Sequence, residues 1–188
     1  MAKMTFVLGG ARSGKSAFAE ELAKKYNEVV YIATAEVKDE EMRERIQTHR
    51  ARRPFNWKTI ESPFHVDRVI SNLNEKAGLV YIDCITLYIT NMILSDDAAN
   101  SAGSADKQRE VLKQKQSQIL GEINKLCKVC RESKSDVIIV SNEVGLGIVP
   151  DNALSRVFRD IAGSANQMIA DEADEVYFVV AGIAQRIK

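Results

Sequence analysis

Two short segments of this chain carry residues whose types and spacing could do chemistry on phosphates. The first, GGARSGKS at residues 9–16, fits the pattern G-x-x-x-x-G-K-[ST] of a phosphate-binding loop. The second, RIQTHRARRP at residues 45–54, contains His49, one of only two histidines in the chain. It surrounds that histidine with Arg45, Arg50, Arg52 and Arg53. Together, the two segments indicate that the protein binds a phosphorylated ligand.

The glycine-rich segment has the context that a phosphate-binding loop requires. A strand-like apolar run precedes it, and the helical pattern SAFAEELAKKY follows it. Glycines permit close backbone approach, and the N–H groups that open a helix point at phosphate oxygens. We predict that Lys15 reaches the β- and γ-phosphates and acts in catalysis, and that the Ser16 hydroxyl ligates Mg²⁺. The predicted nucleotide-binding residues of the loop are Gly9, Gly10, Ala11, Arg12, Ser13, Gly14, Lys15 and Ser16.

A partner carboxylate for the metal ion should stand at the end of a later strand. The run LVYIDC (79–84) places Asp83 at such a point, where it could hold Mg²⁺ directly or through water. An aspartate that merely ends a strand is the alternative.

The histidine segment admits two interpretations. Residues 37–53 have the pattern of an exposed, charge-rich helix, so the arginines could simply be a solvated basic helix end. However, clustered cations disfavour protonation of an imidazole and would also attract a triphosphate. A neutral imidazole is a nucleophile. Together with the phosphate-binding loop, the segment suggests attack by His49 on a phosphorus atom, with a phosphohistidine-type intermediate; a solvated helix end stays the alternative.

The elements that must position these residues alternate along the chain. Strands are predicted at 4–9, 28–33, 79–84, 136–142 and 175–182, with a further short strand at 57–62. Helices are predicted at about 14–26, 38–51, 64–75, 86–95, 107–132 and 151–172. This alternation predicts an α/β fold with a mostly parallel sheet. The small polar residues of 95–108 predict a flexible surface loop inside a single domain spanning 1–188.

Composition and missing motifs exclude several classes of function. The 26 basic and 26 acidic residues balance, so we expect no general attraction to nucleic acid or to a membrane surface. A regulatory GTPase would need an N-K-x-D motif, which the chain lacks. The N-terminus is not a signal peptide, and no apolar run is long enough to span a bilayer, so we expect a cytoplasmic protein. A small phosphoryl- or nucleotidyl-transferring enzyme remains.

Three further residue sets are ambiguous from the sequence. Cys127 and Cys130 form a C-x-x-C in a helical stretch, which favours a core-facing pair over a metal or redox site. Glu143, in SNEVGLGIVP, favours a substrate or subunit contact over a plain turn. His65 is expected to be structural, because no cluster of ligands near it in the sequence supports a metal role.

The chain resembles a known family nearly end to end. GGARSGKS, YIAT (31–34), RIQTHRARRP, SNEVGLGIVP (141–150), FRDIAGSANQ (158–167) and ADEVYFVVAGIAQRIK resemble segments of the bifunctional adenosylcobinamide kinase / adenosylcobinamide-phosphate guanylyltransferase of cobalamin biosynthesis. The resemblance implies a RecA-like P-loop fold of three layers and a homotrimer. It also implies two reactions: phosphorylation of adenosylcobinamide by ATP or GTP, then transfer of GMP from GTP to that phosphate.

The same resemblance implies roles for individual residues. It makes His49 the guanylylated nucleophile. It adds nucleotide contacts at Ala33, Thr34, Ala35, Arg50, Ala51, Arg52, Arg53, Glu61 and Asp83. Some family members have histidine where this chain has Thr48, so His49 has to act without a neighbouring histidine. Some members have glutamate at the position of Asp83, which keeps the charge. A relative with one of the two activities, or a non-catalytic nucleotide-binding module, is the alternative.

Overall fold

The structure analysed is a computed structural model that describes residues 2–36, 40, 43–44, 47, 50, 53–73, 77–95 and 105–188. Of the predicted helix 38–51, the described residues Glu40, Arg43, Glu44, Gln47 and Arg50 are helical. His49, Ala51 and Arg52 lie outside the described residues, as does the part of the predicted loop 95–108 that covers residues 96–104. The last part of that loop was assigned wrongly, because residues 105–108 already belong to a helix.

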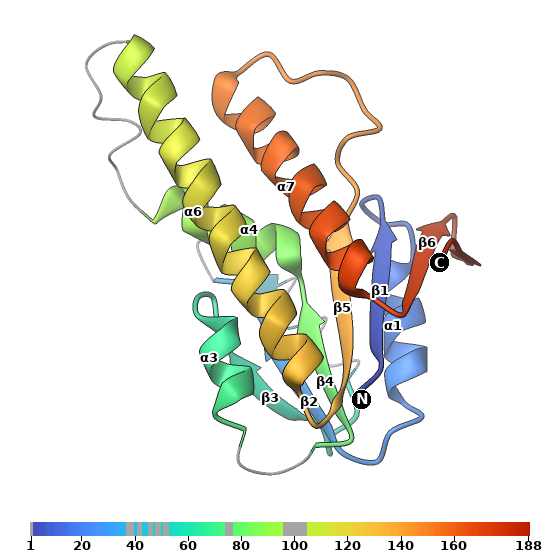
Figure 1. Cartoon of the computed structure of the whole chain (residues 1–188). Helices are drawn as coiled ribbons and strands as arrows, with labels where there is room; N and C mark the ends of the chain where they lie inside the picture. Colours follow the sequence, from blue (N-terminus) through green and yellow to red (C-terminus); the bar gives the residue numbers. More distant parts are fainter. Residues whose placement is uncertain are drawn as a thin grey trace.

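The described residues form a single seven-stranded sheet (Figure 1). Its strands are β1 (Met4–Gly9), β2 (Val29–Ala33), β3 (Lys58–Glu61), β4 (Leu79–Asp83), β5 (Asp136–Asn142), β6 (Glu175–Val180) and β7 (Ile183–Arg186). In space they follow the order β3-β2-β4-β5-β1-β6-β7. Every neighbouring pair is parallel except β6 and β7. The mostly parallel sheet expected from the sequence is confirmed.

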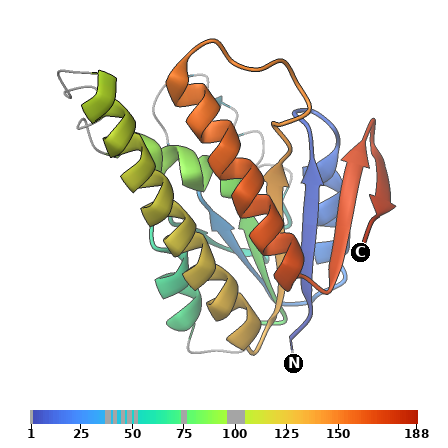
Figure 2. The ribbon, with the colours of Figure 1, turned by 45° about the horizontal axis from the view of Figure 1, so that its top comes forward.

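The C-terminal strand differs from its prediction. Instead of one strand over 175–182, the chain turns back after β6 and adds β7 at the edge of the sheet, shown in dark red in Figure 2. The two turn residues, Ala181 and Gly182, have φ angles of 52° and 81°. Such a pair of left-handed residues makes the tight turn that suits a two-residue hairpin. The apolar run hid this turn, because alanine is an uncommon residue at a positive φ.

Helices cover both faces of the sheet. Those described are α1 (Lys15–Ala23), α3 (Val66–Ser71), α4 (Ile85–Leu94), α6 (Ala105–Glu132) and α7 (Ala153–Glu172). α3, α4, α6 and α7 pack against one face, and α1 packs against the other (Figure 1). The result is the predicted three-layer α/β arrangement.

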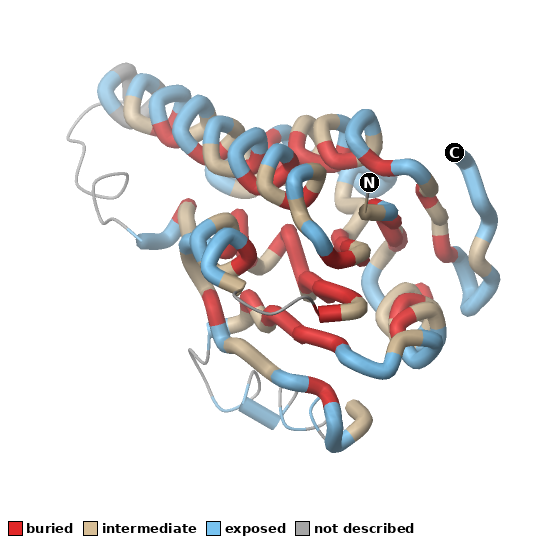
Figure 3. Tube along the Cα trace, turned by 60° about the horizontal axis from the view of Figure 1, so that its bottom comes forward, coloured by how far each residue is buried: buried red, intermediate tan, exposed pale blue. Residues whose placement is uncertain are grey.

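Alternation along the central strands explains why both faces are apolar. Phe6, Ile32 and Ile82 belong to the core under α4, α6 and α7, whereas Tyr31 and Tyr81 belong to the core on the α1 side. Figure 3 shows these strands as buried segments, with the exposed surfaces of the helices outside them. Strands buried on both faces read as nearly continuous hydrophobic runs, which is why the sequence revealed them.

The cysteines of the C-x-x-C motif lie in the core. Cys127 and Cys130 are free and buried in the core under α6, as predicted, and burial raises the pKa of the Cys127 thiol to about 11. Among the described residues, no helix is both long enough and apolar enough to cross a membrane.

Candidate nucleotide-binding site

Parallel pairing brings several predicted site residues to one edge of the sheet. Ala33, the last residue of β2, is in register with Glu61 of β3 on one side and with Asp83 of β4 on the other. β1 ends at Gly9, where the glycine-rich loop begins. Ligands of open α/β sheets bind at the carboxyl ends of the strands, so this edge is the candidate site.

The glycine-rich loop has an ordered backbone that leads directly into α1. Arg12 and Gly14 have φ angles of 56° and 96°, and the Ser13 N–H donates to the Gly10 carbonyl at 3.2 Å. The Lys15 ammonium donates to that same carbonyl at 3.2 Å, which holds it over the loop. α1 begins at Lys15, so the N–H groups of its first turn, which have no acceptor within the helix, open toward the loop. This is the geometry of an anion cradle.

Close packing fixes the loop from behind. A Cβ at Gly9 would lie 2.5 Å from Ser13 Oγ and 2.6 Å from the Val179 carbonyl oxygen, so no side chain fits there. The Gly182 N–H, in the turn of the β6–β7 hairpin, donates to the Ser13 carbonyl at 2.7 Å. The C-terminal hairpin is therefore part of the support of the loop.

Asp83 is held by a tyrosine that the sequence interpretation passed over. Tyr31 Oη donates to Asp83 Oδ2 at 2.6 Å. The guanidinium carbon of Arg53 lies 3.5 Å from the centre of the Tyr31 ring, a cation–π contact. Burial raises the pKa of Tyr31 and the Asp83 carboxylate adds to the effect, whereas Arg53 opposes it. Tyr31 thus joins the acidic residue and the arginine of the site.

The arginine rests on an aromatic cluster and offers an available donor. Tyr31 stacks on Tyr81 at 4.9 Å and on Trp57 at 6.3 Å between ring centroids. Arg53 Nε is buried, and no acceptor for it lies among the residues that the structure describes. A buried N–H without a partner is costly, and a phosphate oxygen would satisfy it.

Electrostatics links the glycine-rich loop to the end of β4. Burial raises the pKa of the Cys84 thiol to about 11, and the neighbouring Asp83 carboxylate contributes to the rise. The Lys15 ammonium acts on the same thiol in the opposite direction. The lysine of the loop and the carboxylate of β4 therefore act on the same thiol in opposite directions.

Thr34 is a link between strands rather than an open binding group. Its buried hydroxyl donates to the Cys84 carbonyl at 2.7 Å and accepts from the Cys84 N–H at 2.8 Å. Its own carbonyl accepts from Asn91 Nδ2 at 2.7 Å. These bonds fix the point at which the chain leaves β4 after Asp83. Its N–H donates to the Asp83 carbonyl at 3.0 Å, so contact between Thr34 and a nucleotide stays a prediction.

The segment after β5 supports the other side of the loop. The Glu143 N–H donates to the Gly9 carbonyl at 3.0 Å, and Asn142 Nδ2 donates to Thr86 Oγ1 at 2.7 Å. The Glu143 carboxylate accepts from the Gly145 N–H within its own turn. These contacts give Glu143 a structural role; a substrate or subunit contact is not tested by them.

The predicted site residues fall into three groups according to their position in the structure. Arg53, Asp83, Lys15 and Ser16 lie at or beside the loop and the carboxyl edge, with Ala33 and Ala35 half-buried there. Glu61 and Arg50 are exposed. His49, Ala51 and Arg52 lie outside the described residues. Reasoning from the sequence missed Tyr31 and Asn91, although a tyrosine within an otherwise apolar strand does signal that its hydroxyl must find a partner.

The fold and the loop together define a class, the P-loop nucleotide-binding proteins. In fold, the chain is similar to an ATPase from the type III secretion system of pathogenic bacteria, with a TM-score of 0.56 and 10% identity. That likeness covers 97% of this chain and 56% of the ATPase chain.

Sequence comparison then specifies the family. The family model "Cobinamide kinase / cobinamide phosphate guanyltransferase" matches residues 5–187, and the chain belongs to this family. It is 42% identical to the bifunctional adenosylcobalamin biosynthesis protein CobU of Escherichia coli K12, over 98% of this chain and 99% of the relative. It is equally 42% identical to CobP of Pseudomonas aeruginosa, over 97% and 95% respectively.

Proposed function

We propose that this protein phosphorylates adenosylcobinamide with ATP or GTP and then transfers GMP from GTP to the product. The observation that carries the proposal is the phosphate cradle, with Lys15 over the loop and Asp83 fixed by Tyr31, in a chain of the cobinamide kinase family. Small-molecule substrates fit this edge of the sheet. A kinase-only or guanylyltransferase-only enzyme, or a binding module without catalysis, is the alternative.

In the phosphoryl transfer, the chain's own residues bind and orient the triphosphate. The loop N–H groups receive the phosphate oxygens, and Lys15 exchanges its bond with the Gly10 carbonyl for the β- and γ-phosphates. Ser16 and Asp83 would hold Mg²⁺, since a hydroxyl and a carboxylate are the hard oxygen ligands that this ion prefers. When bound, the ion neutralises charge on the phosphates. Tyr31 engages Asp83 Oδ2, which orients the carboxylate.

In the guanylyl transfer, His49 is the proposed nucleophile. Its neutral imidazole nitrogen attacks the α-phosphorus of GTP, the bond to the β-phosphate oxygen breaks, and pyrophosphate leaves with that electron pair. The phosphate of adenosylcobinamide phosphate then attacks the same phosphorus and displaces the imidazole. Arg53, seated on Tyr31 with a buried donor, is suited to stabilise phosphate charge. Arg50 and Arg52 would serve the same purpose.

Isotope labelling tests this intermediate directly. The protein is incubated with GTP labelled with ³²P at the α or the γ position, in parallel, and then denatured. We expect covalent, acid-labile label from the α position only. Label from the γ position, or none from either, contradicts the guanylyl-histidine.

A variant pair assigns the label to its residue. His49→Ala should lose the covalent GMP and the transferase activity but should retain GTP binding at the loop. Lys15→Ala should impair both activities, because the lysine serves the phosphates in each. Acid-labile GMP on the His49→Ala protein would overturn the assignment.

The family resemblance also supports a proposal about assembly. We propose a homotrimer in which each chain is one domain over residues 1–188, located in the cytoplasm. Sedimentation equilibrium on the purified protein tests the trimer, and a monomer at micromolar concentration would contradict it.

A further inference from the structure

A second group of ligand-type side chains lies away from the nucleotide site, between α3 and α6. His65 precedes α3, Asp67 lies in the first turn of α3, and Glu122 lies on α6. One ligand atom from each lies within 4.8 Å of the other two. No cluster around His65 could be predicted from the sequence, because its partner Glu122 comes from a distant part of the chain. Packing of α3 against α6 creates it.

The two carboxylates of this group, Asp67 and Glu122, differ in whether a neighbouring group balances their charge. Lys125 Nζ lies 2.7 Å from Glu122 Oε1 and balances that carboxylate from the solvent side. Asp67 Oδ1 is different, because it is buried and no donor to it lies among the described residues.

An unsatisfied buried carboxylate oxygen points to a ligand. Leaving such an atom without a hydrogen bond or a cation is costly, and the cost is greatest for a charged group. The nearest ion pair in the group belongs to Glu122 and not to Asp67. A cation bound between the three side chains would remove that cost.

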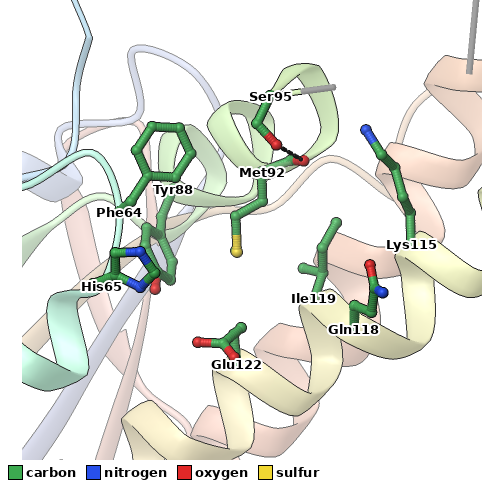
Figure 4. A pocket seen from close by; sticks show the side chains of 9 residues that line it. All are labelled: Phe64, His65, Tyr88, Met92, Ser95, Lys115, Gln118, Ile119 and Glu122. Atoms are coloured by element: carbon green, nitrogen blue, oxygen red, sulfur yellow. Dashed lines mark hydrogen bonds between the residues drawn. The ribbon is translucent and has the colours of Figure 1, made fainter. Parts of the chain in front are cut away.

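The cluster also opens onto a pocket. Figure 4 shows His65 and Glu122 at one end of a hollow of about 180 Å³ between α4 and α6. Its apolar wall is formed by Phe64, Met92 and Ile119. An ion held by the three side chains would therefore keep a coordination position directed at this hollow, open to water or a small donor ligand.

We propose that His65, Asp67 and Glu122 bind a divalent transition-metal ion, with Zn²⁺ as the ion that this donor set fits best. One imidazole and two carboxylates are typical zinc ligands, at about 2.0–2.2 Å from the metal. Mg²⁺ and Ca²⁺ prefer oxygen ligands alone, which separates this site from the proposed Mg²⁺ site at Ser16 and Asp83.

Such an ion would cross-link two elements on the outer layer of the protein. α3 is a short helix of 6 residues, whereas α6 has 28. A short helix contributes little stability of its own and depends on its contacts. A shared metal ion would fasten α3 to α6 and would stabilise the folded state by mass action.

Direct metal binding tests the proposal without nucleotide or activity. Chelator-treated, tag-free protein is titrated with Zn²⁺ by calorimetry and with Co²⁺ by visible absorption, which reports the coordination number. We expect one ion per chain. Zinc at 100 times its dissociation constant should raise Tm by about 5–10 °C.

Two ligand variants and one matched control locate the ion. His65 has a φ of 54°, so His65→Asn is the suitable change, because asparagine tolerates that left-handed conformation while removing the imidazole. This variant and Glu122→Gln should each weaken Zn²⁺ binding by about 100-fold or more, beyond the effect of losing a supporting group. Glu110→Gln, which removes another exposed carboxylate of α6, should leave binding unchanged.

Several outcomes would overturn the proposal. These are no saturable binding at millimolar Zn²⁺, equal affinity in His65→Asn and the unaltered protein, or an equal loss in the Glu110→Gln control. The cysteines do not confuse the result in the folded protein, because all three are buried. Failure here leaves the labelling test of the nucleotide site untouched, since the two measurements share neither ligand nor residues.

Discussion

At the scale of single residues, the site depends on side chains that position the predicted reactive side chains through hydrogen bonds. The sequence predicted Asp83 from its place at the end of an apolar run. It could not predict Tyr31 as the partner of Asp83, because that hydrogen bond joins neighbouring strands whose register only the fold sets. Likewise, the family resemblance implied a nucleotide contact at Thr34, and the structure uses the Thr34 hydroxyl to bind the backbone of Cys84. Residue types are predictable from a motif, but the partners of each residue are not.

Tyr31→Phe tests the importance of this support. Loss of the hydroxyl removes a hydrogen bond to a charged group, worth about 1.5–3 kcal/mol, so kcat should fall by about 10- to 100-fold. The KM for GTP should change little, and the Mg²⁺ concentration for half-maximal rate should rise. Both are read from steady-state kinetics.

The matched control lies at the opposite edge of the sheet. Tyr26 Oη donates to Asp136 Oδ2 at 2.8 Å, a bond of the same kind far from the site. Tyr26→Phe should leave the kinetics unchanged. Equal kinetics in Tyr31→Phe and the unaltered protein, at every Mg²⁺ concentration, would refute the positioning role.

At the scale of elements, the strands and most helices were predictable because their burial is regular. Strands covered on both faces give continuous apolar runs, and α7 shows its core-facing positions at helical spacing. The β6–β7 turn was not predictable, because Ala181 gives no turn signal next to an apolar strand. Nor could the sequence show that this turn contacts the phosphate loop.

Gly9→Ala tests the packing of the loop on its neighbours. The added methyl would lie 2.6 Å from the Val179 carbonyl, part of the backbone of β6, so the loop must shift. We expect nucleotide affinity to fall sharply and the free energy of unfolding to drop by about 1–3 kcal/mol. Calorimetric GTP titration and urea unfolding measure the two effects.

The adjacent glycine supplies the control for this change. At Gly10, an added Cβ meets no atom within 4 Å among the described residues. Gly10→Ala should therefore unfold nearly as the unaltered protein does. If both alanine variants behave alike, close approach at Gly9 is not what the loop requires.

At the scale of the whole molecule, one carboxylate joins three parts of the chain at the amino edge of the sheet. Asp174, just before β6, accepts from the Met4 N–H at 2.7 Å and from Arg131 of α6 at 2.9 Å. The Arg131 bond, then the Met4 N–H, lowers the pKa of Asp174 below its ordinary value. Because the folded state prefers the ionised carboxylate, this contribution to stability is present above the unfolded pKa and is lost as pH falls through the folded pKa.

Stability measured against pH should reveal this junction. The free energy of unfolding is measured from pH 6 to pH 3. Below about pH 3.9, the ordinary pKa of aspartate, it should decline less steeply in Asp174→Asn than in the unaltered protein. Urea unfolding at each pH supplies the curve. Asp171→Asn, which alters an exposed carboxylate of α7, should follow the unaltered protein. Parallel curves for all three would contradict the assignment.

The hydrogen bond from Gly182 to Ser13 has a consequence for biosynthesis. A ribosome makes the phosphate loop well before it makes the hairpin that supports the loop. The pairing of β1 in the sheet is also delayed, since β1 lies between β5 and β6, both of which are translated much later. A nascent chain halted before residue 182 therefore carries the loop's whole sequence without the backbone contact that completes it. The phosphate loop is therefore translated before the elements that bring it to its final form.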